Sequence, residues 1–203
     1  EIVEFVAPHL ETAPRPVASF GQGCEGEPLL EAALIEAAIR AIRGRTARGV
    51  INLNTNGSLP DAIERLARAG LDSIRVSLNS AREPWYTAYY RPRGYDLAAV
   101  AESLRVARRH GMWTSLNYLV FPGLTDREDE TQALERLARD ARINMIQTRN
   151  LNIDPDWYMD ILGLRGETAS AAGMRSWLAR LRQRLPWVRL GYFNPPREDM
   201  RSE

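Results

Sequence analysis

The chain has 203 residues, its 27 basic residues are balanced by 26 acidic ones, and every basic residue is an arginine. This balance gives no sign of the excess of basic residues typical of proteins that bind nucleic acid or an anionic membrane, and the lack of lysine excludes a Schiff-base or P-loop lysine. The single cysteine, Cys24, excludes an internal disulfide, and with two histidines an all-protein zinc site is not expected. No apolar run approaches a membrane span and no basic-then-apolar leader is present, so we expect one cytoplasmic domain over residues 1–203.

Predicted strands and helices alternate along the chain. The first strand is expected at 17–20, before a glycine-rich bend with the sequence GQGCEGEP (21–28). Further strands are expected at 50–57, 73–80, 114–121, 144–153 and 187–193. Apolar residues at helical spacing predict helices over 28–43, 61–69, 97–110, 125–138 and 174–185. Alternation with helices of about 10–15 residues is typical of a parallel α/β fold.

Four of these strands carry polar residues on one face. In the second strand Asn52, Asn54 and Asn56 share a face, and apolar residues occupy the other. The polar positions of the next strands are Arg75, Ser77 and Asn79, then Ser115 and Asn117, then Gln147 and Arg149. Because side chains alternate between the two faces of a strand, a sheet curved into a barrel would enclose a polar lumen, whose amides and guanidinium need partners. We therefore expect a polar-lined α/β barrel that holds water or a polar ligand; an open sheet with one solvated face is the alternative.

The glycine-rich bend follows the first strand, at the end where parallel α/β folds place their sites. Gly26 would let a ligand approach the backbone closely. Free amides at the helix start could bind an anion and Glu27 a cation, so the bend suits a zwitterion. Alternatively, Glu27 only offsets the helix dipole.

Five segments resemble motifs of the radical S-adenosylmethionine (radical SAM) superfamily, in the family's order. They are EGEPLL (25–30), LNTNG (53–57), IRVSLNS (74–80), YYRPRGYD (89–96) and LVFPGLTDREDE (119–130). They resemble, respectively, the GGEP motif with Glu25 in place of its first glycine, the TNG segment, the VSLD-type strand, the substrate-side loop and the PGxTD turn. The resemblance covers about residues 17–155, and a helix and strand follow within 167–193. It implies a partial parallel (β/α)6 TIM-like barrel, here missing its first strand.

The resemblance also implies which residues meet S-adenosylmethionine (SAM). The acid of the GGEP motif and nearby backbone hold the cofactor's ammonium, and residues ending the VSLD-type strand meet its ribose. The predicted cofactor-binding residues are Gly26, Glu27, Ser77, Asn79, Asn117 and Gln147. The predicted substrate-facing residues are Thr55, Asn56 and Arg149. The planar guanidinium of Arg149 suits an anionic substrate group, or it forms a structural ion pair in the lumen.

One family feature is missing from the sequence. Members carry a CxxxCxxC loop that ligates a [4Fe–4S] cluster, and this chain has no such loop, so no metal ligand is predicted in it. Cys24 cannot replace three thiolates, and we expect it to be a packing residue. We expect the cluster ligands in an N-terminal segment absent from this sequence, with residues 1–10 as the tail of the first helix. The strand at 17–20 would then be an open edge that another segment or chain covers.

Three function classes remain open. The first is a radical SAM enzyme, in which a reduced cluster would cleave SAM to a 5′-deoxyadenosyl radical that abstracts hydrogen from a small-molecule or peptide substrate. The second is a cluster-free barrel enzyme, a degenerate relative that uses Glu25 or Glu27 as an acid–base group. The third is a non-catalytic binding scaffold. The aromatic residues of segment 85–95, with Arg91 and Arg93, either stack on a base or line a substrate pocket, or they pack a loop onto the barrel.

Overall fold

The computed structural model describes residues 1–21, 26–165 and 170–200, and these residues form a six-stranded parallel sheet whose spatial order follows the chain order. The strands are β1 (Val17–Phe20), β2 (Val50–Thr55), β3 (Ser73–Leu78), β4 (Trp113–Val120), β5 (Met145–Asn150) and β6 (Arg189–Gly191). The α-helices are α1 (Ile2–Thr12), α2 (Ala32–Arg45), α3 (Pro60–Ala69), α4 (Glu83–Tyr90), α5 (Leu97–Arg109), α6 (Glu128–Asp140), α7 (Pro155–Ile161) and α8 (Met174–Arg184). The predicted parallel α/β fold of the partial-barrel type is confirmed. None of the described helices has the length and apolar character needed to cross a membrane.

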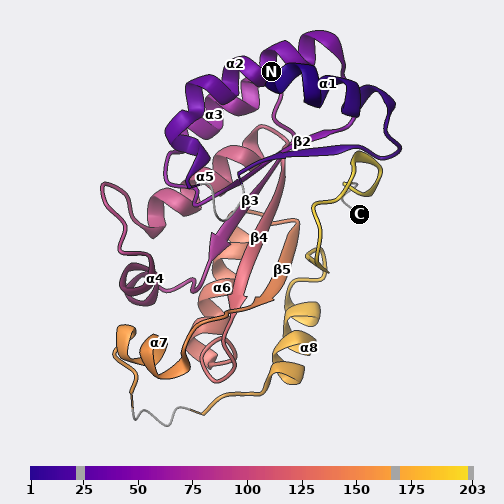
Figure 1. Cartoon of the computed structure of the whole chain (residues 1–203). Helices are drawn as coiled ribbons and strands as arrows, with labels where there is room; N and C mark the ends of the chain where they lie inside the picture. The colour runs from indigo at the N-terminus through magenta and orange to yellow at the C-terminus, as the bar shows by residue number, and fades with distance from the viewer. Residues whose placement is uncertain (22–25, 166–169, 201–203) are drawn as a thin grey trace.

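One face of the sheet is apolar and forms the core with the helices. Leu53, Val76 and Leu116 on this face are fully buried, and they join one cluster with residues of α2, α3, α5, α6 and α8. Figure 1 shows these helices along the sheet, with the chain passing regularly from strand to helix. At about 25 cal/mol per Å² of buried apolar area, this layer is the main source of stability. The polar residues are therefore left on the opposite face, as their alternation predicts.

Strand register aligns those polar residues across the sheet. Asn52 pairs with Ser19 and Ser73, and Asn117 pairs with Ser77 and Gln147. Side chains at paired positions of neighbouring strands lie on the same face. The polar face therefore runs without a break from β1 to β5.

The aromatic segment 85–95, which was expected to be a loop, begins as a helix, α4. Residues 83–90 form a helix, and Trp85 packs in a second apolar cluster with Leu124 and Tyr158. The Tyr89 and Tyr158 rings meet edge to face, with centroids 5.5 Å apart, so α4 packs against α7. Short helices draw their stability from packing rather than from propensity, which is why neither α4 nor α7 is evident from the sequence. The aromatic residues buried here are packing residues.

The segment after β6 returns along the amino ends of the strands, as the yellow trace in Figure 1 shows. Arg197 donates to the backbone oxygen of Gly49, at 2.8 Å, and to Asp72, at 2.7 Å. Asp199 forms an ion pair with Arg15, just before β1. Among the described residues β1 pairs with β2 alone, and this segment reaches it through side chains. Pairing of the β1 edge with another chain stays a prediction.

Candidate functional site

A cavity of about 220 Å³ opens at the carboxyl ends of β1 to β4. Its walls are the bend at Gly26–Pro28, the end of β2 at Asn54–Asn56, and the polar face of β3 and β4 with Arg75, Ser77 and Asn117. The structure thus brings Gly26, Glu27, Thr55, Asn56, Ser77 and Asn117 together at one place. These residues come from four separate segments of the chain, which the parallel sheet brings together.

Glu27 links the bend to the end of β2. Its Oε1 accepts from the backbone N–H of Leu29, at 3.0 Å, and from the hydroxyl of Thr55, at 2.5 Å. Its Oε2 accepts from the backbone N–H of Asn56, at 2.7 Å. Since a carboxylate offers about four acceptor positions, Oε2 retains capacity toward a ligand in the cavity. Glu27 also caps the short 3₁₀ helix at Pro28–Glu31, so the helix-start interpretation describes part of its role.

Gly26 has the backbone freedom that the bend requires. Its φ is +89°, in the region that favours glycine, and a Cβ built there would meet no atom within 4 Å. The space beside this backbone is therefore open. The adjoining Cys24 and Glu25, for which packing and acid–base roles were predicted, lie outside the described residues.

Ser77 and Asn117 face each other across β3 and β4. The Asn117 Nδ2 donates to the Ser77 hydroxyl at 3.4 Å, and the Asn117 Oδ1 is buried without a hydrogen-bond partner among the described residues. A buried polar atom without a partner is costly, and in a cavity wall it marks a position where a ligand donor would be stabilised.

A belt of hydrogen bonds crosses the lumen on the amino-terminal side of this cavity. Arg75 donates to Gln147 Oε1 at 3.2 Å, and Gln147 Nε2 donates to Asn194 Oδ1 at 3.4 Å. Asn194 Nδ2 donates to the Ser19 hydroxyl at 3.4 Å, and Asn52 continues the belt from Ser19 back to β3. Gln147, predicted to contact the cofactor, here positions Arg75, while Asn194 was not predicted at all.

Asn79 lies apart from the cavity lining. Its fully buried side chain donates to the backbone oxygen of Trp85, at 3.2 Å, and to the Tyr158 hydroxyl, at 3.1 Å. These contacts join the end of β3 to α4 and α7. Its predicted contact with the ribose stays a prediction, and its observed contacts are structural.

Arg149 lies on the polar face of β5, two positions beyond Gln147. Its guanidinium lies over the Tyr192 ring, 4.5 Å from the centroid, and its Nε is buried without a partner. No carboxylate within the described part of the chain pairs with it, so the alternative of a structural ion pair is not observed. Arg75, which sequence reasoning did not assign to the site, is a second cation of the lumen.

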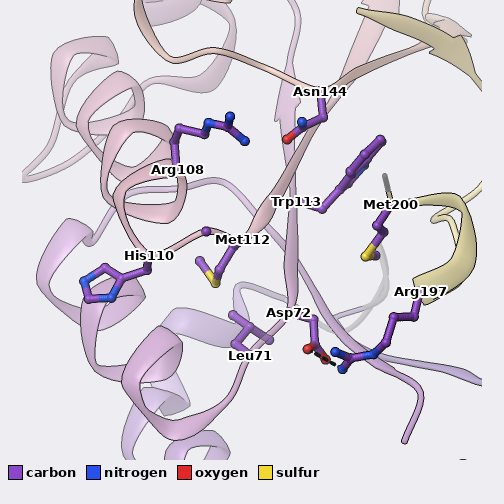
Figure 2. Close-up of a pocket in the computed structure, with 10 residues that line it drawn as sticks. Leu71, Asp72, Arg108, His110, Met112, Trp113, Asn144, Arg197 and Met200 are labelled. Atoms are coloured by element: carbon purple, nitrogen blue, oxygen red, sulfur yellow. Dashed lines mark hydrogen bonds and ion pairs between the residues drawn. The ribbon is translucent and has the colours of Figure 1, made fainter. Parts of the chain in front are cut away.

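A second cavity, of about 350 Å³, lies at the opposite, amino end of the strands (Figure 2). Asp72 and Arg197 pair with each other beside it, and Met112, Trp113 and Met200 supply apolar wall. None of the predicted site residues lines it. Because parallel α/β folds build their sites at the carboxyl ends of the strands, the cavity beside Glu27 is the candidate functional site.

The sequence model of one family, the Radical SAM superfamily, matches residues 15–134, which is more than half of the chain. The chain belongs to the radical SAM superfamily. Members are enzymes that generate radicals, and they generally use SAM and a [4Fe–4S] cluster. The matched segment contains the bend, β2, β3 and β4, and therefore the whole cavity wall described above.

Curated relatives and solved structures agree with membership of the superfamily. Two relatives named GTP 3′,8-cyclase, from Streptomyces coelicolor and Pelotomaculum thermopropionicum, are each 28% identical to this chain, over 74% and 65% of it. The chain spans 44% and 40% of their lengths. A domain of pyruvate-formate lyase-activating enzyme from Bacteroides vulgatus superposes with a TM-score of 0.59 at 10% identity, covering 86% of this chain and 98% of that domain. The hydrogenase maturase HydG has a TM-score of 0.58 at 17% identity, covering 93% of this chain and 43% of HydG. These two structural likenesses show the shared fold.

The two cofactors general to radical SAM enzymes fit this chain differently. The described residues contain no group of three His, Cys, Asp or Glu side chains that could hold a metal, and the sequence has one cysteine. The residues present therefore do not fit a cluster held by three thiolates. The polar groups of the cavity wall are of the kind that SAM needs, because Glu27 can accept from an ammonium, the Asn117 Oδ1 lacks a donor among the described residues, and Gly26 leaves open space beside its backbone.

Proposed function

We propose that this chain is the SAM-binding barrel of a radical SAM enzyme that abstracts hydrogen from a small-molecule or peptide substrate. The observation that carries the proposal is the cavity itself, in which the bend at Gly26–Glu27 meets the polar ends of β2, β3 and β4. The family's motifs supply these same walls. A radical requires an electron source, and the ligands of the cluster that provides it in the family would have to come from outside the described residues.

Each wall of the cavity has a distinct part in binding SAM. Glu27, fixed by Thr55 and Asn56, would accept from the cofactor's ammonium with the capacity left on its Oε2. Ser77 and Asn117 would bond the ribose hydroxyls, which would also satisfy the unpartnered Asn117 Oδ1. The protein's contribution is to hold the cofactor in one orientation and to shield it from competing reactions.

Titration calorimetry of the 203-residue protein with SAM tests this proposal. We expect a dissociation constant on the order of 0.1–1 mM, because only the polar walls contribute to binding. Gly26→Val should abolish measurable binding, since it fills the open space beside the bend. Gly111→Val is the matched control: Gly111 also has a positive φ and open surroundings, but it lies at the amino end of β4.

Both valine variants should lose similar stability through backbone strain, which thermal unfolding measures. Binding retained by a folded Gly26→Val protein, or no binding by the wild type at millimolar SAM, would contradict the proposal.

A further inference from the structure

Two arginine guanidiniums in the lumen lack a carboxylate partner among the described residues. Arg75 makes one hydrogen bond, to the amide oxygen of Gln147 at 3.2 Å, although a guanidinium has five N–H donors. Arg149 rests on the Tyr192 ring, and its Nε is buried without a partner. Within residues 1–21, 26–165 and 170–200, most of the donor capacity of both side chains is thus unused.

Glu27 does not neutralise these arginines. It is the acidic residue in the described cavity lining, and its oxygens accept from Leu29, Thr55 and Asn56 rather than from Arg75. Burial lowers the pKa of Arg75, and the positive charge of Arg149 lowers this pKa further. Arg75 lines the cavity and bonds to Gln147, two positions before Arg149 on β5, so the two positive charges lie near enough to affect each other. No carboxylate of the described residues pairs with either of them.

The surroundings of Arg149 hold it in place while leaving it free to bind. A guanidinium stacked on an aromatic face keeps its N–H edge available, and a fixed planar fork matches a carboxylate or a phosphate. Tyr192 lies just beyond β6, and Gln147 fixes Arg75 from the neighbouring position on the same face of β5. The arginines are thus arranged before any ligand arrives.

We propose that Arg75 and Arg149 form a subsite for an anionic group, a carboxylate or a phosphate, of the enzyme's substrate. The proposal rests on the function proposed above and adds the substrate class to it. SAM itself carries one carboxylate, so an anionic group bound by these arginines could belong to the substrate or to SAM. The experiment must distinguish the two.

Nitrogen NMR of the arginine Nε–H groups, with pyrophosphate and succinate as probes, tests the subsite. We expect pyrophosphate, succinate or both to shift the Arg75 and Arg149 resonances saturably, with and without SAM present. Arg149→Gln should weaken probe binding about tenfold or more, because it removes charge-assisted hydrogen bonds. Tyr192→Leu should weaken it by a smaller factor, while Tyr192→Phe, which keeps the ring, should not.

Arg175→Gln is the matched control, because Arg175 is an exposed arginine on α8. It should leave probe binding unchanged. Arg149→Gln should leave the affinity for SAM within about twofold of the wild type, so that loss of the subsite is distinguished from loss of the cofactor site. Displacement of the probes by SAM would assign the anion to the cofactor and overturn the substrate subsite. So would equal probe binding by Arg149→Gln, or no saturable shift in the wild type.

Discussion

Glu27 shows how one side chain can build a site and also serve it. Its carboxylate receives donors from Leu29, from Thr55 and from Asn56, and these last two residues follow it by 28 and 29 positions. The sequence indicates an acid at a helix start and, by resemblance, an ammonium ligand. It gives no sign of the link to β2, because that link exists only once β1 and β2 are paired.

Glu27→Gln should separate these two roles. The amide keeps one oxygen as an acceptor but turns an N–H toward the Asn56 N–H, so we expect a loss of about 1–2 kcal/mol in the free energy of unfolding. It also removes the negative charge, and the affinity for SAM should fall about tenfold or more. Thr55→Val is the control that removes the Thr55 donor and retains the charge. It should cost a similar free energy of unfolding yet leave SAM affinity within about threefold; an equal loss of affinity in both variants would assign Glu27 a structural role only.

Ser77 and Asn79 show how far the position of a side chain can be predicted from strand alternation. The alternation along β3 places Ser77 in the cavity wall, but Asn79, two positions later, bonds with α4 and α7 instead. Strand β3 ends at Leu78, and beyond it the two-residue period no longer determines where a side chain lies.

At the scale of elements, the buried carboxylate of Glu130 links α6 to the end of β3 through hydrogen bonds. Glu130 is fully buried and accepts from the Ser80 hydroxyl at 2.5 Å, the Ala81 backbone N–H at 2.7 Å and the Tyr118 hydroxyl at 2.5 Å. Burial raises the pKa of Glu130 above its ordinary value of 4.5, although these bonds and Arg82 oppose the shift. The PGxTD turn and the helix after it are predicted from the sequence, but the role of this acid as their anchor is not.

The raised pKa of Glu130 fixes the sign of a pH dependence. The folded state favours the neutral acid, so the stability that this group contributes is complete below pH 4.5 and is lost as pH rises through the folded-state pKa. The free energy of unfolding of the wild type should therefore fall relative to that of Glu130→Gln as the pH rises from 4.5 through neutral pH, measured by urea unfolding. Glu128→Gln, on the same helix, is the control: Arg180 lowers the pKa of Glu128, so its exposed carboxylate gives a small trend of opposite sign. A constant difference between wild type and Glu130→Gln across this range would contradict the prediction.

At the scale of the whole molecule, the segment after β6 connects the β5 side of the open barrel to its β1 side. The strand pattern of the sequence does not predict this connection. The α/β order and the polar lumen follow from the periodicity of the sequence. Asn194, however, contacts Gln147 and Ser19 across 47 and 175 positions, and Arg197 reaches Gly49 across 148. No local pattern encodes such contacts, because they depend on where the chain runs after β6.

Asp72 is the point where this returning segment meets the rest of the fold. It accepts from the Ile51 backbone N–H at 2.7 Å, from Arg43 on α2, and from Arg197 at 2.7 Å. The Asp72 and Arg43 side chains are 18% and 15% exposed, whereas Arg197 is 52% exposed. Two ion pairs thus share one carboxylate, but only the pair with Arg43 is largely removed from water.

We expect these two pairs to differ sharply in what they contribute to stability. Asp72→Asn leaves Arg43 buried without its counter-charge and should lower the free energy of unfolding by about 3 kcal/mol. Arg197→Gln breaks the exposed pair and should cost about 0.5–1 kcal/mol, with the urea m-value unchanged. In a double-mutant cycle, the coupling between Asp72 and Arg197 should stay below about 1 kcal/mol. If Arg197→Gln lowered the free energy of unfolding as much as Asp72→Asn, the prediction would be wrong. The returning segment, rather than the contact between α2 and Asp72, would then be the main stabilising contact at the amino end of the barrel.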